Sequence, residues 1–97
     1  AIHDALKSRQ FEKMHESVSE SLKKGIETEV FRSDIDVEFI ARLYFNGMTG
    51  IKDEVIFPRE KFSMKYLIEN FLEYHLRAIV AKKGFEILNQ FITKNQS

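Results

Sequence analysis

The sequence predicts an all-α domain of about four helices. Apolar residues recur at i, i+3 and i+4 in four successive segments, and no segment alternates long enough to indicate a strand. The one Pro and the four Gly fall mostly at the joints between these segments. At 97 residues the chain forms a single domain, residues 1–97, in which the second and third helices pair antiparallel. We expect the pairs from two chains to form a four-helix bundle.

The first helix is predicted from about Asp4 to about Thr28. Its apolar stripe is narrow and faces one side of the helix. The stripe consists of Phe11, Met14, Val18, Leu22 and Ile26. Because the rest of the surface is charged or polar, this helix is expected to pack on one side only. Gly25 weakens its last turn by about 1 kcal/mol relative to alanine.

The second helix is predicted over residues 37–51. Asp36 is its N-cap, and Ile35 with Ile40 forms a hydrophobic staple across the start of the helix. Apolar side chains cover most of the circumference, so the helix needs neighbours on two sides. Gly47 allows a neighbouring helix to approach closely.

Pro58 interrupts the chain in a loop over residues 52–62, after which Ser63 is expected to cap a third helix that reaches Ile79. Phe62 and Leu67 supply its staple. The last segment, "KKGFEILNQFITK" at residues 82–94, predicts a short fourth helix.

Charge and composition narrow the function. Lys plus Arg and Asp plus Glu number 15 each, which predicts no general attraction to nucleic acid. Cysteine is absent and no long apolar run occurs, so we expect a cytoplasmic protein without a membrane partner. A monomer of this size buries a limited core, so association with a second copy is expected.

The sequence shows no catalytic or metal-binding pattern. His3, His15 and His75 are scattered, and the acidic residues between 27 and 38 lack the spacing of a calcium loop. No nucleophile has a base at motif spacing, and no phosphate-binding loop occurs. We therefore predict no enzyme activity, no metal and no cofactor. His75 lies on an apolar face, where a core or interface role is favoured over ligand contact or pH switching.

Residues 23–51, "KKGIETEVFRSDIDVEFIARLYFNGMTGI", carry a recognisable pattern at the joint between the first two helices. The matching positions are Gly25, Phe31, Arg32, Asp34 and Asp36. The stretch resembles the C-terminal regulatory domain of TetR-family transcriptional repressors, and "YHLRAIVAKKGFEIL" at residues 74–88 is similar to a segment after the last long helix in some members. The resemblance implies a bacterial repressor domain that senses a small molecule and forms homodimers.

The chain departs from that family pattern in three places. Glu29 stands where the family often has a second glycine, which removes a glycine cap from the end of the first helix. Ala81 stands where many relatives have Thr, which removes a side-chain cap from the final helix. No basic recognition helix occurs, so DNA contacts are expected only through an N-terminal helix-turn-helix domain missing from these residues.

These considerations give two sets of site residues. The effector, an apolar or aromatic small molecule, is expected to contact Met14, Val18, Leu22, Phe39, Leu43, Tyr44 and His75. The dimer interface is expected to contain Ile40, Phe45, Gly47, Met48, Ile51, Ile68, Phe71, Leu72 and Ile79. The alternative is a stand-alone helical module that binds a partner protein and holds no ligand. An upstream basic helix-turn-helix of about 45 to 50 residues would favour the repressor.

Overall fold

The chain folds into four α-helices within residues 2–96, the range over which a computed structural model describes the backbone; side chains are described for residues 4–93. The helices are α1 (Ile2–Glu27), α2 (Val37–Gly50), α3 (Met64–Ile79) and α4 (Lys82–Gln96). The predicted all-α class is therefore confirmed, and each predicted helix end lies within two residues of the observed one.

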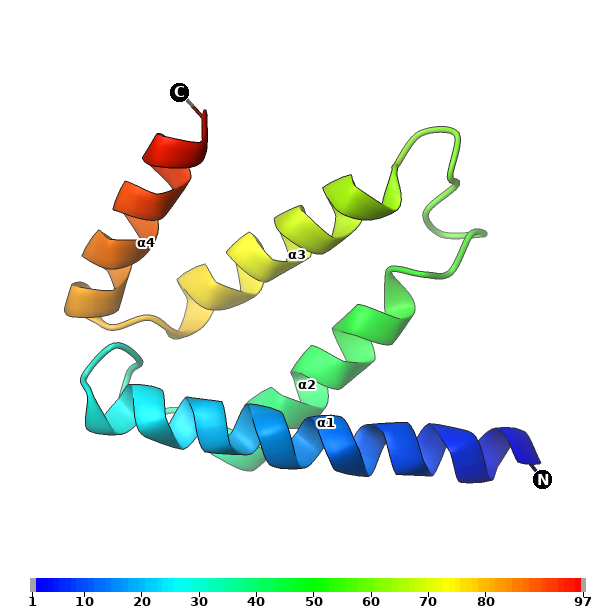
Figure 1. The fold of residues 1–97 in the computed structure, drawn as a ribbon, viewed down its shortest axis with the longest axis horizontal. Helices are drawn as coiled ribbons and strands as arrows, with labels where there is room; N and C mark the ends of the chain where they lie inside the picture. The colour runs from blue at the N-terminus through cyan, green and yellow to red at the C-terminus, as the bar shows by residue number, and fades with distance from the viewer. Residues whose placement is uncertain (1, 97) are drawn as a thin grey trace.

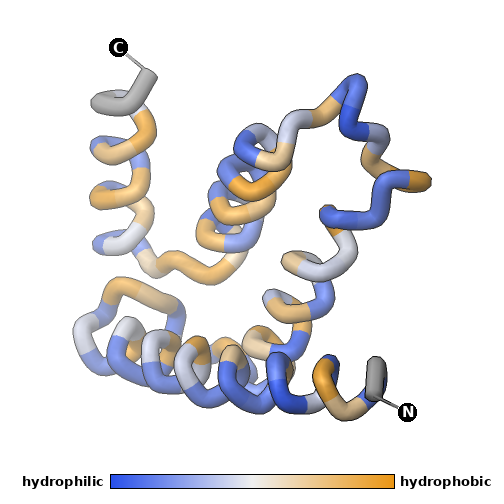
Figure 2. Tube along the Cα trace, turned by 45° about the vertical axis from the view of Figure 1, so that its right-hand side comes forward, coloured by the Kyte–Doolittle hydropathy of each residue, from blue (hydrophilic) through white to orange (hydrophobic). Residues whose placement is uncertain are grey.

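The helices are arranged around the long α1. Helix α2 packs across α1, and α3 returns antiparallel to α2 after the loop over residues 52–62 (Figure 1). Helix α4 then turns away from this pair. Figure 2 shows apolar segments on α4 and at the outer tip of the α2–α3 loop, far from the contact of α1 with α2. Much of the apolar surface thus lies outside the core.

The core joins α1, α2 and α3 through three buried side chains. Leu22, Ala41 and Ile79 are exposed by 3%, 0% and 2%, respectively. Partly buried apolar side chains surround this cluster: Val18, Phe31, Ile35, Val37, Ile40 and Leu76. Both staple residues of α2, Ile35 and Ile40, pack against it, so the staple fixes how the chain enters α2.

Two helix starts follow local signals that the sequence displays directly. The Asp36 carboxylate accepts a hydrogen bond from the backbone N–H of Phe39 at 3.1 Å. The Ser63 hydroxyl accepts one from the backbone N–H of Tyr66, also at 3.1 Å. Each bond satisfies a donor that the first helical turn leaves free, which confirms both predicted N-caps.

The end of α1 is capped by a residue other than glycine. Glu29 adopts the left-handed conformation, with φ 65°, that a glycine normally supplies at this position. Its N–H donates to the carbonyl of Ile26 at 3.1 Å, and the N–H of Val30 donates to the carbonyl of Gly25 at 2.8 Å. This pair of bonds defines a Schellman motif. The cap therefore forms without glycine, and Glu29 carries the backbone strain.

The molecule is flat and open. Its extents are 43 × 31 × 16 Å, its radius of gyration is 15.1 Å, and its accessible surface is 7546 Å². A compact domain of 97 residues has a radius of gyration of about 12.5 Å. None of the helices within residues 2–96 is both long enough and apolar enough to cross a bilayer.

Candidate ligand site

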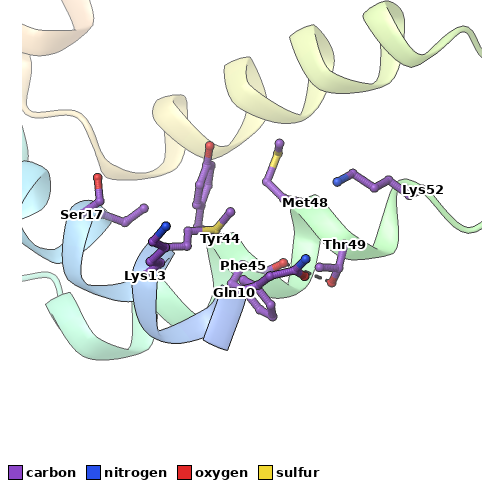
Figure 3. Close-up of a pocket in the computed structure, with 10 residues that line it drawn as sticks. Gln10, Lys13, Ser17, Tyr44, Phe45, Met48, Thr49 and Lys52 are labelled. Atoms are coloured by element: carbon purple, nitrogen blue, oxygen red, sulfur yellow. Dashed lines mark hydrogen bonds between the residues drawn. The ribbon is translucent and has the colours of Figure 1, made fainter. Parts of the chain in front are cut away.

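A pocket of about 640 Å³ lies between α1 and α2 and opens toward α3 (Figure 3). Side chains from two stretches of chain line it, one on α1 and one that runs from α2 into the residues that follow. The lining consists of Gln10, Lys13, Met14, Ser17, Val18, Tyr44, Phe45, Met48, Thr49 and Lys52. The pocket is a groove largely open to solvent, so a ligand in it would stay partly exposed.

The side of the pocket formed by Phe45 is apolar and is held by aromatic contacts. The Phe45 side chain is 8% exposed, and its ring meets that of Phe11 on α1 edge to face, with centroids 5.2 Å apart. Aromatic pairs favour this geometry, so the contact helps to fix the α1–α2 crossing. Met14 and Met48 add flexible thioether side chains that adapt to different apolar shapes.

Behind the pocket, an aromatic layer connects α2 to α3. The Tyr44 ring lies 5.9 Å from that of Phe71 and 5.1 Å from that of His75, centroid to centroid. A side chain at Gly47 would collide with the Phe71 ring, so this glycine makes room for that ring of α3. Any ligand that moves Tyr44 therefore acts on α3.

His75 is a buried histidine, 9% exposed, packed against the rings of Tyr44 and Phe71. Burial lowers the pKa of His75 below its usual value, because the imidazolium form loses hydration there. The side chain is therefore neutral at pH 7. It lies behind Tyr44 and does not line the pocket.

The structure brings together three of the residues predicted to contact an effector: Met14, Val18 and Tyr44. Leu22 instead lies in the core cluster. Phe39 and Leu43 lie on the surface, exposed by 58% and 46%.

Sequence analysis missed the polar part of the pocket, chiefly Lys13 and Lys52. Polar positions on an amphipathic helix normally face water. Lys13 was therefore not predicted to line a pocket. One signal was present, since Tyr44, Met48 and Lys52 are spaced four residues apart and therefore share one face if the helix continues for a turn.

Most residues predicted for a dimer interface also contact other parts of the same chain. Phe45, Ile51 and Ile79 are buried. Met48 lines the pocket and Gly47 meets Phe71. The remaining members, Ile40, Ile68, Phe71 and Leu72, are partly exposed. The large apolar side chains of α2 that stay most exposed are Phe39 and Leu43.

The acidic joint between α1 and α2 is tied to the α3–α4 connection. The backbone of residues 30–32 pairs with residues 79–81: the N–H of Arg32 donates to the Ile79 carbonyl and the N–H of Ala81 donates to the Val30 carbonyl, each at 2.9 Å. The Lys83 ammonium donates to the Thr28 carbonyl at 3.1 Å. The joint thus fixes the C-terminal end of α1 against the C-terminal end of α3 and the start of α4.

Arg32 adds a side-chain link at this joint. Its guanidinium donates two hydrogen bonds to the Asp34 carboxylate, both at 3.0 Å, and a third to the Ala78 carbonyl at 2.9 Å. The hydrogen bond and charge attraction between the partners raise the pKa of Arg32, and the same bond lowers the pKa of Asp34. Arg32 thereby satisfies a carbonyl at the end of α3.

No group of three or more His, Cys, Asp or Glu side chains in the described part of the chain is placed to bind a metal ion. Comparisons with protein-family models, with curated proteins and with solved structures found no match.

Proposed function

We propose that the chain is the ligand-sensing and dimerisation domain of a TetR-like transcriptional repressor. In this proposal, a small apolar or aromatic molecule binds between α1 and α2. Its binding controls operator release by a DNA-binding domain to which these residues are joined, in the bacterial cytoplasm. The observation that carries the proposal is the pocket between α1 and α2, lined by Met14, Val18 and Tyr44.

The joint supports the proposal by offering a route from the ligand to the rest of the domain. A ligand that separates α1 from α2 displaces Tyr44, which stacks on Phe71 of α3. The end of α1 is also tied to α3 through Arg32. Binding can shift a conformational equilibrium only by its difference in affinity for the two states, and these contacts make that affinity depend on where α3 lies.

The experiment is a thermal-shift screen of neutral apolar and aromatic compounds on the chain and on its Met14→Trp variant. The larger indole occupies part of the pocket at the position of Met14, so we expect compounds that raise the melting temperature of the parent to lose most of that effect. Tyr74→Trp is the control, because Tyr74 is 77% exposed and does not line the pocket. Equal stabilisation of the parent and Met14→Trp would place the site elsewhere.

A second candidate function is a helical module that binds a partner protein and no ligand. Exposed apolar side chains on α4 favour it, since Phe85, Ile87 and Phe91 are exposed by 44%, 52% and 64%. Under this alternative, no compound in the screen stabilises the chain.

A further inference from the structure

The pocket between α1 and α2 combines an apolar floor with positive charge only. The two Met, Val18 and the aromatic rings supply the apolar surface. The charged side chains among the lining residues are Lys13 and Lys52, and no carboxylate lines the pocket. A neutral apolar ligand would form no ion pair with these two ammonium groups.

Neither ammonium has a partner among the described side chains. Some arginines are paired, such as Arg42 with Glu38 at 3.0 Å and Arg77 with Glu73 at 3.1 Å. Other exposed lysines of the described residues, such as Lys23 and Lys24, also form no ion pair. The side-chain ammonium groups of Lys13 and Lys52 appear in no ion pair and no hydrogen bond within residues 4–93. Lysine stems lie readily along apolar surface while their charged ends stay in water. Both positive charges are therefore available to a ligand.

The lysines reach the pocket from different segments, Lys13 from α1 and Lys52 from the residues just after α2 (Figure 3). Tyr44 and Met48 lie between them in this view. From residue 44 to residue 52 the rise along a helix is about 12 Å. The pocket thus offers an extended apolar surface with an ammonium group toward each end.

We propose that this pocket binds an amphipathic organic anion, a carboxylate with an apolar or aromatic body. The body packs on Met14 and Met48, and the carboxylate pairs with one of the two ammonium groups, that of Lys13 at one end or that of Lys52 at the other. Lysine is a compact point charge rather than a planar fork, so the site selects the sign of the charge more than its geometry. This inference rests on the proposed ligand-sensing function and defines its ligand class.

Three probes that share one apolar body test the inference: 4-phenylbutyrate, 4-phenyl-1-butanol and 4-phenylbutylamine. Methyl-labelled methionine NMR reports where each binds, because two of the three methionines, Met14 and Met48, line the pocket and Met64 does not. We expect all three probes to shift the Met14 and Met48 signals and to leave Met64 unchanged. The carboxylate should bind about fivefold more tightly than the alcohol, and the amine more weakly, as exposed charge pairs allow.

Variants assign the preference to the two lysines. Lys13→Gln with Lys52→Gln should remove the advantage of the carboxylate and leave the affinity for the alcohol unchanged. Lys23→Gln is the matched control, since Lys23 is exposed on α1 and lies outside the pocket. Raising the salt concentration to about 1 M should also reduce the advantage, because screening then acts within about 3 Å.

Two results overturn the inference in distinguishable ways. Equal affinities of the parent for carboxylate and alcohol, both with shifts at Met14 and Met48, would refute the anion preference and keep the sensor. Absence of any Met14 or Met48 shift, together with no stabiliser in the neutral screen, would refute both the anion site and the ligand-sensing function. A shift of Met64 alone would place binding outside the pocket and refute the inference.

Discussion

Glu29 holds the end of α1 with φ 65°, a conformation that costs a side-chain-bearing residue about 1 to 2 kcal/mol. Glu29→Gly removes this strain but gives the unfolded chain more freedom. We expect a net gain of about 0.5 to 1 kcal/mol in the free energy of unfolding, seen as a rise of a few degrees in melting temperature.

Glu29→Ala separates the backbone effect from the charge. Alanine removes a carboxylate that lies at the unfavourable, negative end of the α1 dipole but retains the left-handed strain. If the backbone strain dominates, the free energy of unfolding of Glu29→Ala stays within about 0.5 kcal/mol of that of the parent. Equal stabilisation by alanine and glycine would instead attribute the gain to the charge.

His75 makes stability depend on pH. Its folded pKa is lowered by burial, so between that value and the unfolded pKa of about 6.5 the unfolded state binds more protons than the folded state. The contribution of neutral His75 is complete above pH 6.5 and is lost as the pH falls through the folded pKa. The slope from this residue is at most about 1.4 kcal/mol per pH unit.

Urea denaturation of the parent and of His75→Leu, between pH 5 and pH 8, isolates this effect. Leucine cannot titrate, so the difference in the free energy of unfolding between the parent and the variant should change below pH 6.5 and stay constant above it. A difference that is constant across the whole range would contradict the buried, neutral histidine.

At the scale of helices, the sequence predicted the elements well because their signals are local. Asp36 and Ser63 cap helices through bonds that reach three residues along the chain, so no knowledge of the fold was needed. The facing of Leu43 and the role of Lys13 depend on how α1 crosses α2. That crossing arises from contacts between distant residues, such as Phe11 with Phe45, which helical periodicity does not encode.

The position of α4 depends on Gly84. An added Cβ there would run into the backbone carbonyl of Val30, whereas one at Gly50, the last residue of α2, would meet nothing. We expect Gly84→Ala to lower the free energy of unfolding by about 1 to 3 kcal/mol through this clash. Gly50→Ala should raise it by about 0.5 kcal/mol, because alanine favours the helix.

Urea denaturation of both variants checks this contrast, and hydrogen exchange along α4 locates it. Faster exchange within residues 82–93 of Gly84→Ala is the expected result, since the start of the helix must move away from Val30. If both alanine variants gain stability alike, α4 does not lie against the joint in solution.

The whole molecule exposes more surface than a compact monomer should. A chain of 11.4 kDa folded compactly exposes about 5,800 Å², so the observed 7546 Å² exceeds that value by roughly 1,800 Å². In an interface of standard size each partner buries only about 800 Å². The excess is therefore large enough for an extensive dimer interface, and large apolar side chains are exposed on α2, on α4 and at the loop tip.

Phe39 and Leu43 lie four residues apart on one face of α2, exposed by 58% and 46%, and we expect a second chain to cover them. Light scattering should give twice the chain mass at micromolar concentration.

Phe39→Glu should raise the dissociation constant of the dimer at least about tenfold, since association then buries an unpaired charge. Val55→Glu, on the loop tip at 90% exposure, is the matched control and should leave association unchanged. A folded monomer at micromolar concentration would refute the dimer. If Val55→Glu dissociates the dimer and Phe39→Glu does not, the chains instead meet through the α2–α3 loop.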